Sequence, residues 1–302
     1  MLTLQDANVR SAKRTGRSDR ACLVTKILLI GATSSLAHAL LPRLAEFADV
    51  VTAGRTGCDV QLDFRGDINI PRGFDAVVNT AAHLGGDDAT SMIEAELVNA
   101  VGMIKLCKAS TEARVGHLVH VSSGFAELPS TSPSFGIYAL SKRHADEVAN
   151  LYSTRYSLPL AIVRPSRLYG AGETYRRNQP FLYTLMDKAE ANEDIVIFGA
   201  NDAQRNFIHV EDVANVLALT VQRRLLGSFS CAYPENLRYS LIARAAIEAF
   251  VSGSSVRFAE TERDIPDDVF QLDGALFRLL GYAPRISMED GMRMEANHRR
   301  AR

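Results

Sequence analysis

The chain has 302 residues, of which 47% are hydrophobic and 23% charged, a composition typical of a folded globular protein and unlike that of a disordered or fibrous one. Its 34 Lys and Arg residues are balanced by 35 Asp and Glu residues, which gives a formal net charge of −1. Without an excess of positive charge, binding to nucleic acid or to an anionic membrane loses its usual electrostatic basis. We therefore expect a small-molecule partner, no nucleic acid and no membrane.

Four cysteines lie far apart, with no C-x-x-C pair among them: Cys22, Cys58, Cys107 and Cys231. This spacing favours buried free thiols over a zinc site or a disulfide framework, so we expect no metal. No apolar run approaches the roughly 20 residues that span a bilayer. The polar, Arg-rich residues 1–24 are expected to form a loose leader ahead of the fold. These features predict a cytoplasmic protein.

Short apolar runs alternate with longer helical patterns through the first half of the chain. The runs are predicted strands at 26–30, 49–52, 74–79, 117–121 and 160–163. The predicted helices between them cover about 35–47, 89–110 and 136–156. This alternation is typical of βαβ units, so we predict an α/β fold of the Rossmann type with a doubly wound parallel sheet.

After Arg164 the pattern changes, because glycines and polar clusters divide the chain into shorter pieces. One further apolar run at 207–210 leads into a helix at 212–221. We expect residues 25–165, with about 205–225, to form the Rossmann domain. Residues 166–204 and 226–302 are expected to form a smaller C-terminal α/β cap.

The turn between the first strand and the first helix is a candidate phosphate cradle. Backbone N–H groups and the positive end of a helix can hold a pyrophosphate there. The usual glycine fingerprint requires small residues at three positions, which are Gly31, Ser34 and Ala37 here. Because only one glycine is present, the motif fits either a dinucleotide cradle or an ordinary turn. The candidate cofactor contacts are Gly31, Thr33, Ser34, Ser35 and Leu36.

The second strand is followed by Arg55, at a place where an acidic residue commonly binds the ribose of NAD. An arginine there could face a 2′-phosphate, which favours NADP(H), although an exposed surface arginine is nearly as good an interpretation. Asp63 follows a short third strand. It could contact the adenine or could be an ordinary turn carboxylate.

The segment Tyr138-Ala-Leu-Ser-Lys142 is the candidate catalytic motif. Four residues are one helical turn, so the phenol and the ammonium share one face. A nearby Lys⁺ favours the phenolate, so we expect a lowered pKa for Tyr138. Just upstream, Val121-Ser-Ser-Gly124 ends a predicted strand, and Ser123 is our candidate for binding a substrate carbonyl, with Ser122 as the alternative.

With these motifs, the sequence from Lys26 to about Gly291 resembles the extended short-chain dehydrogenase/reductase family, in its NAD-dependent epimerase/dehydratase group. Further blocks that carry the resemblance are 78–83, 98–102, 162–170, 205–214, 279–284 and 288–291. The resemblance implies a Rossmann domain that holds a nicotinamide cofactor and a substrate-binding cap. It also implies that Tyr138 is the acid/base, that Lys142 binds the nicotinamide ribose and that Ser123 orients the reacting oxygen.

The resemblance also assigns the remaining cofactor-side residues, which are Thr80, Ala81, Ala82, Asn99, Tyr138, Lys142 and Pro165. Asn99 is expected to brace a helix or relay water, and His83 and His209 are expected to be structural. Family members that act on nucleotide sugars use an arginine at the position of Arg205 for the diphosphate. Arg167 could grip phosphate bidentately. Arg263 is either a second clamp or a partner in a surface salt bridge.

Short connections between Arg55 and Phe74 and between Ser123 and Tyr138 are similar to those of the nucleotide-sugar 4-keto reductases. We therefore expect an oxidoreductase that prefers NADP(H), with NAD(H) possible, and reduces a 4-keto sugar linked to a nucleotide. One alternative is an epimerase or dehydratase that retains NAD, although Gly124 and Phe125 stand where dehydratases usually carry an acidic pair. Another is a non-catalytic dinucleotide sensor. The family suggests a homodimer through the helices at 89–110 and 136–156.

Overall fold

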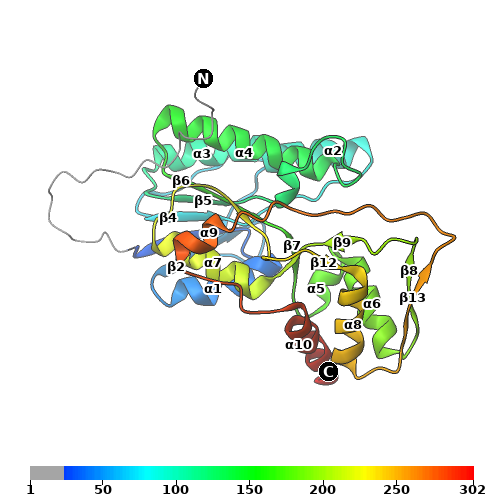
Figure 1. Cartoon of the computed structure of the whole chain (residues 1–302). Helices are drawn as coiled ribbons and strands as arrows, with labels where there is room; N and C mark the ends of the chain where they lie inside the picture. Colours follow the sequence, from blue (N-terminus) through cyan, green and yellow to red (C-terminus); the bar gives the residue numbers. More distant parts are fainter. Residues whose placement is uncertain (1–23) are drawn as a thin grey trace.

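The computed structural model describes residues 24–302. Cys22 and the expected leader, Val24 excepted, lie outside the described residues. A seven-stranded, all-parallel sheet forms the centre of the molecule, in the order β11-β6-β5-β4-β1-β2-β3 (Figure 1). Its strands are β1 (Lys26–Ile30), β2 (Asp49–Gly54), β3 (Val60–Gln61), β4 (Ala76–Asn79), β5 (Leu118–Val121), β6 (Leu160–Pro165) and β11 (Gly227–Cys231). The predicted Rossmann-type α/β fold is confirmed.

Helices cover both faces of the sheet (Figure 1). One face carries α1 (Ser35–Ala45), α7 (Val210–Gln222) and α9 (Ala275–Leu280). The other carries α2 (Ala89–Ala95), the π-helical turn η1 (Glu96–Val101), α3 (Gly102–Glu112) and α4 (Ile137–Tyr156). Alternate residues of β1 explain this arrangement, since Ile27 and Leu29 pack in the core beneath α1, whereas Leu28 and Ile30 pack in the core beneath α3.

The second half of the chain builds a cap beside the carboxyl ends of the strands (Figure 1). Its helices are α5 (Glu173–Arg176), α6 (Pro180–Glu190), α8 (Tyr239–Phe250) and α10 (Met288–Arg300). Three strand pairs accompany them: β7 (Arg167–Tyr169) with β10 (Phe207–His209), β9 (Gln204–Arg205) with β12 (Leu237–Arg238), and β8 (Ile195–Phe198) with β13 (Val256–Ala259). The chain thus passes between the two parts more than once.

The edge strand β11 pairs in parallel with β6, although its residues fall in the range that we assigned to the cap. Helix α9 packs against β11 and therefore also lies with the sheet. The sequence of β11, Gly-Ser-Phe-Ser-Cys, is half polar and gives no continuous apolar run. An edge strand needs less apolar surface than a central one, which is why the pattern was weak.

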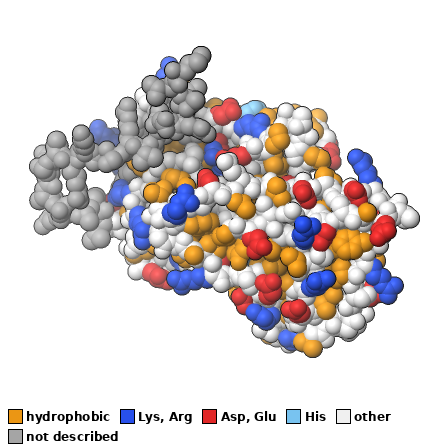
Figure 2. All heavy atoms as spheres, viewed as in Figure 1, with side chains coloured by type: hydrophobic (Ala, Val, Ile, Leu, Met, Phe, Trp, Pro, Cys, Tyr) orange, Lys and Arg blue, Asp and Glu red, His pale blue; other side chains and the backbone are white. Residues whose placement is uncertain are grey.

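On the face in Figure 2, acidic and basic side chains are interspersed and do not gather by sign, in keeping with the balanced composition. Within residues 24–302, every helix is too short or too polar to cross a bilayer. Among the same residues, no three His, Cys, Asp or Glu side chains are grouped so that they could hold a metal ion.

Candidate active site

A cavity of about 500 Å³ opens at the carboxyl ends of β1, β2, β4, β5 and β6. Ligands of doubly wound sheets bind at this edge, near the point where the strand order reverses. Most of the predicted site residues line it: Gly31, Thr33, Ser34, Ser35, Leu36, Arg55, Asp63, Thr80, Ala81, Ala82, Ser123, Tyr138, Lys142, Pro165 and Arg167. The structure therefore brings the predicted cradle and the predicted triad into one cavity.

Gly31 is the residue of the cradle at which any side chain would strain the structure. Its φ is +79°, a conformation that L side chains rarely adopt. A Cβ at this position would lie 2.6 Å from the backbone nitrogen of Ala81 and 2.9 Å from Oγ1 of Thr80. The loops after β1 and β4 are thus in close contact, and this contact shapes the floor of the cradle.

The two positions where the fingerprint lacks glycine have structural roles of their own. Ser34 is the N-cap of α1, and its Oγ accepts a hydrogen bond from the Ala37 N–H at 3.2 Å. The same hydroxyl lies 3.1 Å from Oγ1 of Thr80, while Ala37 is fully buried between helix and sheet. The N-terminus of α1 lies beside the cavity with a capped but uncharged end, which fits a pyrophosphate.

The region around the end of β2 carries two arginines. Arg55 is exposed, lines the cavity and makes no ion pair with any residue in the range 24–302. Arg65 also lines the cavity but is paired with Asp63 and Glu94. The pKa of Asp63 is lowered, chiefly because its carboxylate accepts a hydrogen bond from the Arg65 N–H. Arg55 is therefore the cation that is available to a ligand phosphate.

The three predicted catalytic side chains meet where β5 and α4 approach each other. Tyr138 lies in the first turn of α4, and Lys142 lies one turn later, fully buried. The Lys142 ammonium donates a hydrogen bond to the carbonyl oxygen of Val121 at 2.8 Å. Ser123 follows β5 and caps the short helix η2 (Gly124–Glu127), with its Oγ accepting a hydrogen bond from the Phe125 N–H at 3.3 Å, and it lines the cavity together with Tyr138.

The pKa of Tyr138 is raised, which overturns the prediction of a lowered one. Burial is the largest cause, and the Ser123 hydroxyl only partly opposes it by favouring the phenolate. The prediction failed because it considered the spacing to Lys142 and not the burial of Tyr138 itself. Burial also lowers the pKa of the Lys142 ammonium, to about 8. At neutral pH, Tyr138 is therefore a protonated donor.

Burial of Lys142 has a cost for stability. Its pKa falls from 10.5 to about 8, which corresponds to about 3 kcal/mol at about 1.4 kcal/mol per pH unit. Below pH 8 both folded and unfolded states carry the proton, so the full cost applies. Between pH 8 and 10.5 the unfolded state binds more protons, and the stability contributed by this residue rises with pH.

We therefore expect Lys142→Met to be more stable than the parent at pH 7 by about 2 kcal/mol, after about 1 kcal/mol for the lost hydrogen bond to Val121. The gain should shrink above pH 8, vanish just below pH 10 and become a loss of about 1 kcal/mol above pH 10.5, where only the lost hydrogen bond counts. Urea unfolding of both proteins from pH 6 to 10 measures it. A variant that is less stable at pH 7 would contradict the buried-charge explanation.

Aromatic side chains form the wall beside Tyr138. The Phe125 ring lines the cavity and lies edge-on to the Tyr138 ring, with centroids 6.1 Å apart. Behind it, Phe270 packs on Phe125 with centroids 5.4 Å apart, and a Cβ at Gly124 would lie 2.7 Å from the Phe270 ring. The two positions after Ser123 thus hold an apolar wall and no carboxylate.

Asn99 does not line the cavity. Its side chain accepts a hydrogen bond from the His83 N–H at 2.8 Å and donates to the His83 carbonyl at 2.8 Å and to Oγ of Ser141 at 2.9 Å. All of its polar atoms are therefore used to brace the loop after β4 against α4. This geometry corresponds to the bracing role and leaves no group for direct contact with a cofactor.

Both histidines that attracted attention in the sequence have local structural contacts. His83 lines the cavity, but its Nδ1 accepts a hydrogen bond from the Gly85 N–H at 3.0 Å. His209 caps α7 by accepting from the Glu211 N–H at 3.3 Å. Burial lowers the pKa of His209, so its ring is neutral at pH 7.

Arg167 reaches the cavity but is already paired. It forms an ion pair with the buried carboxylate of Asp268, which also accepts a hydrogen bond from Ser134, and its guanidinium lies 4.5 Å from the centroid of the Phe125 ring. A phosphate at Arg167 would have to share or displace Asp268. The sequence pattern gave no sign of this partner, which lies about a hundred residues away.

The other two predicted arginines lie outside the cavity lining. Arg205 donates hydrogen bonds to the carbonyls of Gln204 and Pro266, both at 2.8 Å, and stacks on the Tyr239 ring at 4.9 Å. Arg263 is exposed. Their roles in binding substrate remain predictions.

Several cavity residues were missed by the sequence analysis, namely Arg65, Phe125, Ser166, Tyr175, Asn178 and Gln179. The hydroxyl of Ser166 is buried and has no hydrogen-bond partner among residues 24–302, which fits a polar ligand. Tyr175, Asn178 and Gln179 follow the block at 162–170, but no local pattern marks them. Only the return of the cap over the sheet brings them to the cavity.

Comparison with known proteins agrees with this geometry. The model of the NAD-dependent epimerase/dehydratase family matches residues 27–228. The chain is 34% identical over 108 residues to a dTDP-4-dehydro-6-deoxy-D-allose reductase of Streptomyces bikiniensis, covering 35% of this chain and 33% of that one. It is 23% identical over 252 residues to a dTDP-glucose 4,6-dehydratase of Streptomyces niveus, covering 76% and 73%.

Among solved structures, the UDP-N-acetylglucosamine 4-epimerase from Bacillus cereus has a similar fold, with a TM-score of 0.74 at 18% identity over 90% of this chain and 98% of that one. The family model covers the cradle, the triad and the sheet up to β11. With sequence blocks, fold and site in agreement, this chain belongs to the NAD-dependent epimerase/dehydratase family of extended short-chain dehydrogenase/reductase enzymes.

Proposed function

We propose that this protein is an NADP(H)-preferring oxidoreductase that reduces the 4-keto carbonyl of a nucleotide-linked sugar. The observation that carries the proposal is the meeting of Ser123, Tyr138 and Lys142 in the cavity that also borders the N-terminus of α1. The matching reductase and dehydratase, both named for dTDP-linked sugars, support the substrate class.

The chain's own residues supply the proton chemistry. A nicotinamide dinucleotide held by the cradle and Arg55 would supply the hydride. Ser123, which lines the cavity together with Tyr138, would orient the substrate carbonyl. Tyr138 would donate its proton to the carbonyl oxygen, and the Lys142 ammonium would stabilise the resulting phenolate. One hydride and one proton convert the ketone to the alcohol.

Two features favour reduction over dehydration. The raised pKa of Tyr138 keeps the phenol protonated at pH 7, as a proton donor requires. The wall formed by Gly124 and Phe125 offers no carboxylate for removing a second proton. A non-catalytic sensor is the least supported hypothesis, because it would need none of the Ser123, Tyr138 and Lys142 side chains.

A second candidate is an epimerase that keeps its dinucleotide through a full cycle. It is favoured by the contact of Tyr175 with Ser35, which links the cap to the cradle. The two candidates differ in cofactor use, because a reductase consumes one NADPH per product and an epimerase consumes none.

The test uses sugars linked to UDP, dTDP, GDP or CDP. The 4-keto forms are incubated with NADPH or NADH, and the corresponding 4-hydroxy forms are incubated with NAD. We expect oxidation of NADPH with one of the four nucleotides and a product two mass units heavier than the ketone. Interconversion of sugars without net cofactor use would contradict the reductase proposal and support the epimerase. No reaction with any of them would contradict the assigned substrate class.

Arg55 is the residue that we propose for NADP(H) preference. Because it is exposed and free of ion pairs within residues 24–302, it can bind a 2′-phosphate, a charged hydrogen bond worth about 1.5–3 kcal/mol. Arg55→Asp should lower the ratio of NADP to NAD affinity by about 10-fold to 100-fold, measured by titration. An unchanged ratio would exclude this role.

We also propose a homodimer through α2, α3 and α4. Apolar side chains lie exposed on these helices, including Ile93, Ile104 and Leu151, with 66%, 43% and 61% of their surface accessible. Sedimentation velocity should give a dimer mass, and a monomer at micromolar concentration would contradict it.

The cellular location is proposed from the cysteines. The buried free thiols of Cys107 and Cys231 suit a reducing compartment, so we place the protein in the cytoplasm, which cell fractionation can check.

A further inference from the structure

One segment of the cap, residues 172–179, lies against the dinucleotide side of the cavity. It contains α5 and contributes Tyr175, Asn178 and Gln179 to the lining. Tyr175 is nine-tenths buried, and its hydroxyl donates a hydrogen bond across the cavity to the carbonyl oxygen of Ser35 at 3.3 Å. Ser35 is the first residue of α1, so the cap contacts the Rossmann domain at the phosphate cradle itself.

This hydrogen bond is long for an O–H donor, whose usual distance to oxygen is about 2.7–2.8 Å. A phosphate oxygen carries negative charge and is a stronger acceptor than a peptide carbonyl. Burial raises the pKa of Tyr175 to about 12, so its hydroxyl keeps the proton. A pyrophosphate at the N-terminus of α1 would therefore be a better acceptor for Tyr175 than Ser35 is.

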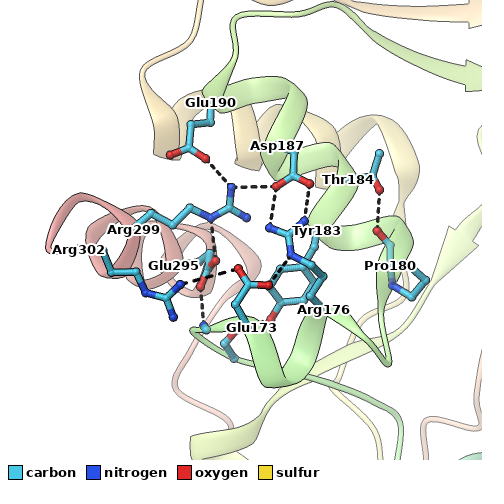
Figure 3. Close-up of polar contacts among 12 residues, drawn as sticks. Glu173, Arg176, Pro180, Tyr183, Thr184, Asp187, Glu190, Glu295, Arg299 and Arg302 are labelled. Carbon is cyan, nitrogen blue, oxygen red and sulfur yellow. Dashed lines mark hydrogen bonds and ion pairs between the residues drawn. The ribbon is translucent and has the colours of Figure 1, made fainter.

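The start of the segment is fixed by the C-terminal helix. Gly172 has a φ of +104°, which lets the chain turn sharply before α5, and its N–H donates to Oε2 of Glu295 at 2.7 Å. Glu295 lies on α10 and is almost fully buried. Its other oxygen accepts from Nε of Arg299 at 2.8 Å (Figure 3).

The end of the segment is fixed by the same network. Arg299 also reaches Asp187 at 3.0 Å and Glu190 at 2.5 Å on α6. The Asp187 carboxylate in turn accepts hydrogen bonds from both terminal nitrogens of Arg176, the last residue of α5 (Figure 3). Arg299 is only 11% exposed, whereas Asp187 and Glu190 are 40% and 49% exposed, so these ion pairs are shielded from solvent on the arginine side alone. The guanidinium of Arg299 is therefore connected to both ends of α5, through Glu295 at the start and through Asp187 at the end.

We propose that Tyr175 is a dinucleotide-binding residue, which donates a hydrogen bond to the pyrophosphate, and that Arg299 positions it through Glu295 and Asp187. The proposal rests on the proposed function, since it requires a dinucleotide in the cradle. The dinucleotide then lies between α1 and the α5 segment, so its release requires this segment to move. Ion pairs on α10 consequently control how long the cofactor stays bound.

Tyr175→Phe tests the binding role, because it keeps the ring and removes only the hydroxyl. We expect NADPH to bind about tenfold more weakly, as for the loss of a hydrogen bond to a charged group. Adenosine 2′-monophosphate, which has no pyrophosphate, should bind both proteins equally in the same titration. A general loosening of the cavity would weaken both ligands.

Arg299→Met tests the positioning role. We expect NADPH to leave about five to ten times faster in a stopped-flow displacement, and Arg299→Lys to recover part of the slow release. The matched control is Arg293→Met, because Arg293 is on the same helix, is 60% exposed and pairs only with Asp290 in its own helix within residues 24–302. Its release rate should equal that of the wild type.

The outcomes distinguish a failure of the roles of Tyr175 and Arg299 from a failure of the proposed function. If the wild type binds NADPH and Tyr175→Phe binds it equally well, the role of Tyr175 is wrong and the proposed function stands. If Arg299→Met and Arg293→Met release NADPH at the same rate, the positioning role is wrong. Should Arg299→Met fail to fold, Glu295→Gln, which keeps an acceptor for Gly172, decides the same point. If the wild type binds no dinucleotide, the proposed function itself fails.

Discussion

Replacing Tyr138 by Phe is expected to reduce kcat by about 10²–10⁴-fold, the usual contribution of a positioned general acid. The ring would keep its edge-on packing against Phe125, so the fold and the cavity should be retained. What is lost is the proton donor beside Ser123. Steady-state rates with the 4-keto sugar found in the substrate panel measure the effect.

The same titration that measures dinucleotide affinity provides the control for this prediction. NADPH affinity should change by no more than about threefold in Tyr138→Phe, because the cradle and Arg55 are untouched. Tyr152→Phe is a matched control, since Tyr152 lies on the same helix, α4, and does not line the cavity. Undiminished turnover by Tyr138→Phe would mean that another group donates the proton.

The second large effect is expected for Gly31→Ala. The left-handed φ of +79° costs an L residue about 1–2 kcal/mol, and a methyl group 2.6 Å from the Ala81 nitrogen forces the loop after β4 to shift. Together we expect a loss of about 3 kcal/mol in stability and at least a 100-fold loss in NADPH affinity, because the shifted backbone belongs to the cradle.

Gly57→Ala separates the two causes. Gly57 also has a positive φ, +66°, but a Cβ there would meet nothing within 4 Å. It should lose only about 1 kcal/mol and keep full NADPH affinity, as seen by urea unfolding and titration. If Gly31→Ala behaves like Gly57→Ala, the close approach of the two loops does not shape the site.

Much of this site could be predicted because its signals are local. The strand-to-helix turn at Gly31 and the one-turn spacing of Tyr138 and Lys142 depend only on backbone geometry. The carboxyl ends of the strands then had to meet at one edge, because the seven strands of the central sheet are all parallel.

The features that escaped prediction all depend on distant partners. Asp268 pairs with Arg167 from a segment about a hundred residues further along, and Tyr175 reaches the cradle only because the cap folds back over the sheet. The pKa of Tyr138 has the same origin, since its direction is set by burial and not by the spacing to Lys142. A one-dimensional pattern gives residue types but not the solvent around them.

The buried Lys142 shows how function and stability oppose each other in this site. A desolvated ammonium next to Tyr138 destabilises the fold below pH 8, yet its charge is what would stabilise a phenolate. Its single hydrogen bond in the described chain, to the carbonyl of Val121, offsets only part of the cost. A residue kept at such a cost is expected to serve the chemistry.

The central claim is that the cavity at the carboxyl edge of the sheet binds a nicotinamide dinucleotide for hydride transfer. Calorimetric titration of the purified protein with NADP(H) and NAD(H) tests it most directly. We predict one dinucleotide bound per chain, with NADP(H) tighter than NAD(H) and with the binding weakened in Gly31→Ala. Failure of the wild-type protein to bind either dinucleotide would contradict the account.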